Sequence, residues 1–370
     1  MTKSLTLIAA LAAGLTVGLT SSTAVLAQSK GTVNVYNWSD YIDEELLSKF
    51  EDETGYKLVY DVFDSNEVLE TKLLAGGSGY DVVVPSAEFL QRQIQAGAFQ
   101  QLDMSKIPNA GGLWDVVSSR TAQYDPGNAY SVNYMWGTTG LGTNVGKITE
   151  ILGEDAPLNS MELIFNPDNM AKLADCGVYF LDAPAEVIRA ALTYLGEDPD
   201  TTDAKTIQKA ESVLMAVRPY VKKFHSSEYI TALANGDICA AIGWSGDVLQ
   251  ARDRAAEADN GVEVAYNAFV EGSQMWFDQM AIPADASNVE GAHAFINFII
   301  QPENMAAASN YVYYANGVLD SQPLLLEDVI GDTAIYPDAE TLSTLYTTSP
   351  WDPKNQRIAT RLWTKVTTGN

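Results

Sequence analysis

The feature of this sequence that most constrains its fold is a repeated alternation of short apolar strands with amphipathic helices. A segment that begins at Val33 and the segment Lys57–Phe63 both have strand character, and a helical pattern follows each of them. Tyr80–Val84 is a short apolar run of the kind that is buried on both faces of a parallel sheet. We therefore predict an α/β chain that is built on parallel strands.

The length of the chain and its first residues indicate an exported protein with two domains. The 370 residues exceed what one compact core usually holds. Lys3 precedes an apolar run over residues 5–19, and small residues lead to a cleavage site before Gln28, so residues 1–27 are predicted to be a signal peptide. A membrane anchor is the weaker alternative, because the run is short and lacks a basic flank.

The charge of the chain excludes several classes of partner. The formal net charge is −26, which makes nucleic acid and anionic membranes unsuitable partners. The only two histidines, His225 and His293, lie far apart in the sequence, which argues against a histidine-built metal site or catalytic triad. No nucleotide-binding motif is present. We therefore expect neither a metal nor a cofactor.

Two cysteines, Cys176 and Cys239, lie in the mature part of the chain. An even number of cysteines in an exported protein favours a disulfide. Cys176 lies just before the predicted strand Gly177–Leu181, and Cys239 lies within the predicted strand Asp237–Ile242. Neighbouring strands would bring the two within bridging range, whereas two buried thiols are the alternative.

A recurring unit, an aromatic residue with a carboxylate nearby, occurs where predicted strands end. The pairs are Trp38 with Asp40, Trp244 with Asp247, and Trp276 with Asp278, and the further candidates are Ser86, Glu186 and Tyr314. In open α/β sheets, ligands bind outside the carboxyl ends of the strands. Aromatic faces attract cations, and a buried ammonium group must be paired with an anion. The pattern favours a slot for a flexible chain with ammonium ends. Sugar binding or glycoside hydrolysis is the alternative.

Longer motifs in the chain resemble the periplasmic putrescine/spermidine-binding proteins of ABC importers. The resemblance extends from about Val33 to Lys365, and the motifs that carry it are Tyr36–Tyr41, Val62–Glu70, Phe180–Pro184, Phe224–Ser227, Leu233–Cys239 and Ala241–Asp247. It implies a type II periplasmic binding protein with two lobes, each a mixed sheet flanked by helices, and a ligand in the cleft between them. Lobe 1 would comprise residues 28–137 plus about 263–318, and lobe 2 residues 138–262 plus about 319–370.

The resemblance also implies roles for individual residues. The amine-holding residues would be Ser39, Ser86, Asp247 and Asp278. The aromatic box would consist of Trp38, Trp244, Trp276 and Tyr314, and the remaining cleft residues would be Asp40, Tyr41 and Glu186. Cys176 and Cys239 would be bridged. The protein would be a periplasmic monomer and not an enzyme, and its closed form would dock on an inner-membrane ABC permease. A polyamine-sensing receptor is an alternative role.

Two positions depart from the putrescine-type pattern. Residue 276 is Trp, where putrescine-preferring relatives tend to carry Phe. Residue 88 is Glu in place of a small polar residue, and an extra carboxylate near the cleft could serve a third amine. A solvated acid in the first turn of the helix after Ser86 is the alternative for Glu88. Together these departures favour spermidine slightly over putrescine, although Ala183 is of the putrescine type, and both ligands are expected to bind.

Overall fold

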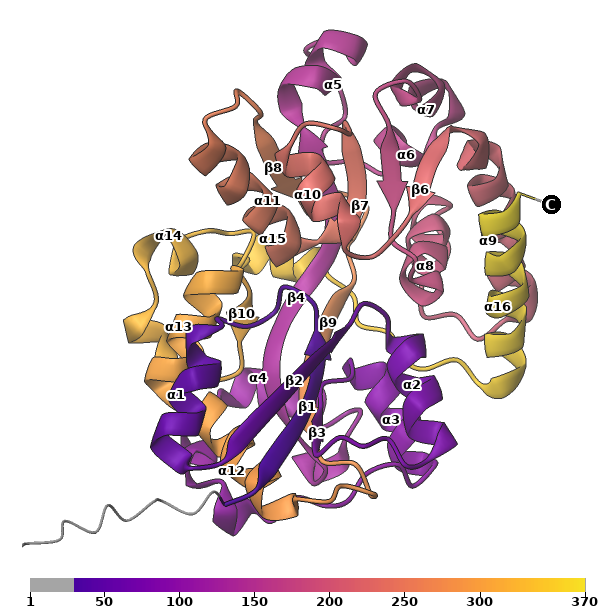
Figure 1. Ribbon diagram of the computed structural model, residues 1–370. Helices are drawn as coiled ribbons and strands as arrows, with labels where there is room; N and C mark the ends of the chain where they lie inside the picture. Colours follow the sequence, from indigo (N-terminus) through magenta and orange to yellow (C-terminus); the bar gives the residue numbers. More distant parts are fainter. Residues whose placement is uncertain (1–29, 370) are drawn as a thin grey trace, which may run out of the picture.

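The computed structural model describes residues 30–369, and the predicted signal peptide, residues 1–27, lies outside them (Figure 1). Within the described residues, no helix has both the length and the apolar character that crossing a bilayer requires. The strands are β1 (Thr32–Trp38), β2 (Lys57–Phe63), β3 (Val82–Val83), β4 (Ser131–Asn144), β5 (Val178–Phe180), β6 (Val221–Phe224), β7 (Ala240–Trp244), β8 (Val264–Asn267), β9 (Met275–Ala281) and β10 (Ala315–Asn316).

Sixteen α-helices connect and cover these strands within residues 30–369. The first eight are α1 (Glu45–Thr54), α2 (Asn66–Ala75), α3 (Ala87–Gln95), α4 (Asp115–Thr121), α5 (Val145–Leu152), α6 (Glu162–Phe165), α7 (Pro167–Leu173) and α8 (Pro184–Tyr194). The others are α9 (Ala204–Val217), α10 (Glu228–Ala234), α11 (Ser245–Ala258), α12 (Val289–Ile299), α13 (Pro302–Val312), α14 (Glu327–Ile330), α15 (Ala339–Thr344) and α16 (Pro353–Thr368). The C-terminal helix α16 packs beside α8 and α9 (Figure 1).

The strands form a mixed sheet, with the order β2-β1-β3-β9-β4-β7-β5-β6. Strand β1 pairs in parallel with β2 and β3, and β5 pairs in parallel with β6 and β7, as the strand–helix alternation predicts. The two parallel groups are joined by antiparallel strands, because β9 pairs with β3 and β4 while β4 also pairs with β7. The expectation of parallel strands alone is therefore too narrow, and the mixed sheet that the resemblance implies is confirmed.

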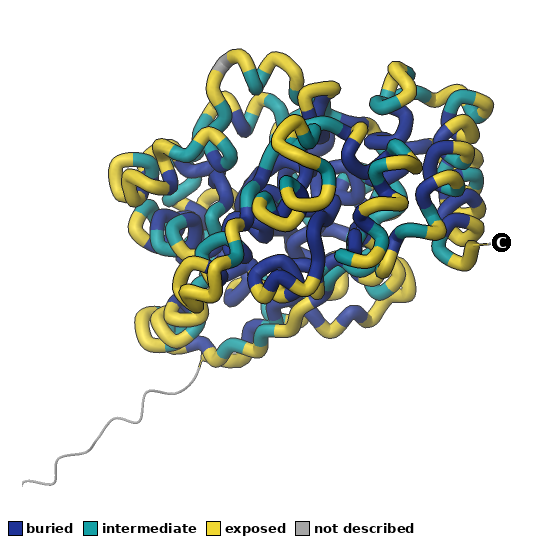
Figure 2. Tube along the Cα trace, turned by 90° about the horizontal axis from the view of Figure 1, so that it is seen from above, coloured by how far each residue is buried: buried dark blue, intermediate teal, exposed yellow. Residues whose placement is uncertain are grey.

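The apolar interior consists of two clusters. The first core lies around β1, β3 and α12, and the second core lies around β5, β7 and helices α8 to α11. Strand β4 is buried over all its 14 residues and extends from one core to the other. Figure 2 shows the buried segments in the centre of the molecule and the exposed segments around the outside. The lobe boundaries expected from the sequence stay a prediction.

The disulfide between Cys176 and Cys239 is present, with the two Cα atoms 5.6 Å apart. It joins Cys176, two residues before β5, to Cys239, the residue directly before β7, and these two strands pair in parallel. The bond confirms the pairing that the even cysteine count favoured. It also fastens these strands at the end opposite to Trp244, the last residue of β7.

Candidate functional site

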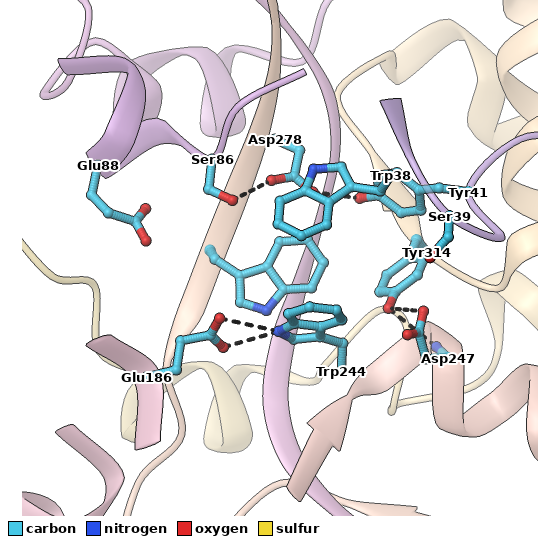
Figure 3. A pocket seen from close by; sticks show the side chains of 11 residues that line it. Trp38, Ser39, Tyr41, Ser86, Glu88, Glu186, Trp244, Asp247, Asp278 and Tyr314 are labelled. Atoms are coloured by element: carbon cyan, nitrogen blue, oxygen red, sulfur yellow. Dashed lines mark hydrogen bonds between the residues drawn. The ribbon is translucent and has the colours of Figure 1, made fainter. Parts of the chain in front are cut away.

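Eleven of the twelve predicted site residues line one pocket (Figure 3). They are Trp38, Ser39, Tyr41, Ser86, Glu88, Glu186, Trp244, Asp247, Trp276, Asp278 and Tyr314. The pocket forms where β1 and β7 reach their carboxyl ends and where the segments after β3 and β5 enter helices α3 and α8. Parallel strands bring their carboxyl ends to one edge, which explains why segments far apart in the sequence meet here.

Asp278 on β9 is a buried carboxylate with two hydroxyl donors. Its side chain is 4% exposed, and its two oxygens accept hydrogen bonds from Ser86 Oγ at 2.7 Å and Tyr41 OH at 2.8 Å. Burial raises the pKa of Asp278 to about 7, and these hydrogen bonds offset only part of that effect. In this buried place the ionised form of Asp278 needs a neighbouring cation, and none of the residues that line the pocket is Lys or Arg.

Asp247, in the first turn of α11, has the same kind of environment. Its oxygens accept hydrogen bonds from Tyr314 OH and Tyr229 OH, each at 2.7 Å. Burial raises the pKa of Asp247 to about 7. Tyr229 also accepts a hydrogen bond from the backbone N–H of Trp244 at 3.1 Å, so it ties the end of β7 to Asp247. Sequence reasoning missed Tyr229, because a buried tyrosine inside α10 has the appearance of an ordinary core residue.

Glu186, in the first turn of α8, holds one wall of the aromatic box. Its carboxylate accepts hydrogen bonds from Trp244 Nε1, at 3.2 and 3.0 Å to its two oxygens (Figure 3). It also accepts a hydrogen bond from Thr139 Oγ1. Burial, together with the nearby Glu88, raises the pKa of Glu186 to about 8, although the hydrogen bonds from Thr139 and Trp244 oppose this effect. Thr139 lies in the middle of β4 and carried no sequence signal for this contact.

Four aromatic rings pack edge to face around the pocket. The ring centroids of Trp38 and Trp244 are 5.4 Å apart, as are those of Trp276 and Tyr314. Trp38 Nε1 donates to the carbonyl oxygen of Val84 at 2.9 Å, which fixes the orientation of that ring. Such rings offer both a flat apolar surface for methylene groups and a negative face for cations.

The structure places Asp40 outside the pocket. Its backbone has φ of 52°, in the left-handed region, and its carboxylate pairs with Arg254 on α11 at 2.9 Å. The carboxylate is therefore directed to an exposed ion pair, whereas the neighbouring Ser39 and Tyr41 line the pocket. Asp40 is the one predicted site residue that the structure does not bring together with the others.

Acidic side chains line the pocket, and basic side chains do not. Four of its lining residues carry carboxyl groups, and none of its lining residues is Lys or Arg. Buried carboxylates are stable as anions only when a cation or several hydrogen bonds compensate them. The arrangement can bind a small cationic molecule with an apolar middle part.

Comparison with known proteins gives consistent matches over nearly the whole chain. Residues 45–335 match the family described as bacterial extracellular solute-binding protein. The chain is 51% identical to the putrescine-binding periplasmic protein SpuD of Pseudomonas aeruginosa (strain UCBPP-PA14), over 95% of this chain and 96% of that protein. It is 49% identical to the putrescine-binding periplasmic protein PotF of Escherichia coli (strain K12), over 94% of both.

Comparison with solved structures finds the same fold in a polyamine-binding protein. The structure of the spermidine/putrescine ABC transporter substrate-binding protein PotD from Streptococcus pneumoniae superposes with a TM-score of 0.71. It is 29% identical in sequence, and the match covers 92% of this chain and 99% of that one.

Proposed function

The chain belongs to the bacterial extracellular solute-binding protein family, and we propose that it is the periplasmic polyamine-binding component of an ABC importer. The observation that carries this proposal is that buried carboxylates and a box of aromatic rings line the same pocket, and that no Lys or Arg lines it. Its ligands would be putrescine and spermidine. It would act as a monomer that binds without catalysing a reaction, and it would deliver its ligand to an inner-membrane permease.

The ligand supplies the positive charges that the pocket lacks. One ammonium group binds Asp278 together with Ser86, and another binds Asp247 together with Ser39. The aromatic rings cover the methylene groups between them, which contributes about 0.8 kcal/mol for each buried CH₂. Because Asp278 lies on β9 and Asp247 on α11, a bound diamine links both lobes and favours the closed arrangement.

Calorimetric titration of ligand-stripped protein with putrescine tests the proposal. We expect a dissociation constant that is micromolar or lower, which corresponds to about −8 kcal/mol or better. The matched control is 1,4-butanediol, which has the same four-carbon chain but no charge, and we expect it not to bind. A folded sample that binds neither putrescine nor spermidine, or that binds the diol equally well, would contradict the proposal.

The affinity for a diamine should fall when the pH is lowered from 8 to 6. Burial raises the pKa of Asp247 and Asp278 to about 7 and that of Glu186 to about 8 in the empty pocket, and burial also raises the pKa of Glu88. Since the ammonium groups bind the ionised carboxylates, protons compete with the ligand below these values. Each carboxylate that must lose a proton reduces the affinity by up to about tenfold per pH unit.

The pH dependence is measured by calorimetry at pH 6, 7 and 8, in pairs of buffers with different ionisation enthalpies. We expect protons to be released on binding, with the largest number at the lower pH values. Equal affinity at pH 6 and pH 8, without proton release, would contradict the raised pKa values.

A further inference from the structure

A second space adjoins the pocket on the side of Glu88, and we call it the annex. It shares Trp38, Glu88, Glu186 and Trp244 with the pocket and continues to Glu67 and Ala183. Figure 3 shows Glu88 at the side of the pocket near Ser86 and Glu186, with its carboxylate directed inward and Asp247 on the far side. The annex therefore continues the pocket away from Asp247.

Glu88 is a buried carboxylate without a partner. Its side chain is 8% exposed, and among residues 30–369 no other residue forms a hydrogen bond or an ion pair with its carboxylate. Arg189 and Arg92 act on Glu88 as positive charges, but Arg189 binds Asp200 at 3.1 Å and Arg92 binds Glu70 at 2.5 and 2.7 Å. Burial outweighs both arginines and raises the pKa of Glu88.

The other walls of the annex add negative charge and space. Glu67, in the first turn of α2, is half-buried, and burial raises its pKa to about 7. Asp64 and Glu186 contribute two more carboxylates beside those of Glu67 and Glu88, and Ala183 contributes only a methyl group. None of the residues that line the annex is Lys or Arg. A cation in this space would therefore meet several acidic side chains and no basic one.

We propose that the annex binds the third ammonium group of a linear triamine, with Glu88 as its principal partner. This inference rests on the proposed function, because it requires that the first two ammonium groups occupy the sites at Asp278 and Asp247. Glu88 then determines specificity: a diamine fills the pocket alone, whereas a triamine fills the pocket and the annex. The preferred ligand class is thus a triamine such as spermidine.

The substitution Glu88→Gln separates this role from a structural one. It removes the negative charge and keeps the size of the side chain. We expect the affinity for spermidine to fall by about 10- to 100-fold, because a buried charge pair loses one partner, and the affinity for putrescine to change by less than about threefold. Loss of a first-turn acid from helix α3 would instead lower the folding stability without changing the ratio of the two affinities.

Calorimetry on the whole mature protein, with putrescine, spermidine and N-acetylated spermidines, measures these ratios. An acetylated spermidine carries one ammonium group fewer, so Glu88→Gln should affect its binding less than that of spermidine. The matched control is Glu150→Gln, which removes the same charge from an exposed position on α5 and should leave all affinities unchanged. The annex would be supported further if Glu67→Gln weakened spermidine binding in the same selective way.

Failure of this inference and failure of the proposed function give different results. If Glu88→Gln weakens spermidine and putrescine equally, or weakens neither, the annex does not hold a third ammonium group, and the proposed function stands. If the unaltered protein binds no polyamine, both proposals fall. If its affinity for spermidine does not exceed its affinity for putrescine, the triamine preference is wrong.

Discussion

Replacement of Asp278 by Asn is expected to weaken the binding of putrescine by roughly 2–5 kcal/mol, a factor of about 30 or more. The amide has nearly the size of the carboxylate and can still accept a hydrogen bond from Ser86 or Tyr41. It cannot neutralise an ammonium group, which would then be buried without a counter-charge. Titration calorimetry at about pH 8, where the unaltered carboxylate is mostly ionised, measures the full effect.

Two further variants make this result specific. Asp247→Asn should cost a similar amount, because Asp247 is held by two tyrosine hydroxyls in the same way. Asp155→Asn removes the same charge from an exposed position and should leave the affinity unchanged. If both pocket variants bind putrescine as tightly as the unaltered protein, the carboxylates do not hold the ammonium groups.

Removal of the disulfide is expected to lower the free energy of unfolding by about 2–4 kcal/mol. The bridge closes a loop between cysteines 63 positions apart, and breaking it gives the unfolded chain more conformations. Because it fastens β5 to β7 far from Trp244, the affinity of the folded protein for polyamine should change little. Urea unfolding of a Cys176→Ala, Cys239→Ala variant, without ligand, measures the effect.

The control for the disulfide variant is the unaltered protein after chemical reduction of its disulfide. It should unfold at nearly the same urea concentration as the double variant, since both lack only the bond. A variant that unfolds at the same urea concentration as the oxidised protein would show that the bridge does not stabilise the fold.

Local sequence patterns could predict most strands, because alternation and apolar runs depend on neighbouring residues. Strand β2 occupies Lys57–Phe63 as predicted. The predicted strand Tyr80–Val84 is wrong at its ends, where only Val82–Val83 form β3. Asp81 accepts hydrogen bonds from the backbone N–H groups of Asn34 and Asn288, and Pro85 has no N–H to donate. The partners of Asp81 are distant in sequence and could not be foreseen.

The antiparallel joining of the two halves was likewise beyond local patterns. Strands β4 and β9 are extended and buried. The sequence of neither strand indicates which strand it pairs with, or whether that pairing is parallel or antiparallel. The resemblance to a known family implied the mixed sheet, whereas periodicity indicated parallel strands alone.

The sequence predicted those pocket residues that are aromatic or acidic and lie near the ends of predicted strands. Aromatic and acidic residues after strands pointed to the cluster that the structure brings together. Asp40 differs from its neighbours only through its left-handed backbone and its partner Arg254, 214 positions away. Tyr229 and Thr139 act on site carboxylates from core positions, so composition could not distinguish them from packing residues.

A crystal structure of the protein with bound putrescine tests the central claim most directly. We expect one ammonium nitrogen within about 2.7–3.2 Å of an Asp278 carboxylate oxygen and the other equally close to Asp247. The methylene groups should lie between the rings of Trp38, Trp244 and Trp276. A ligand bound elsewhere, or one in this pocket whose ammonium groups contact neither aspartate, would contradict the account.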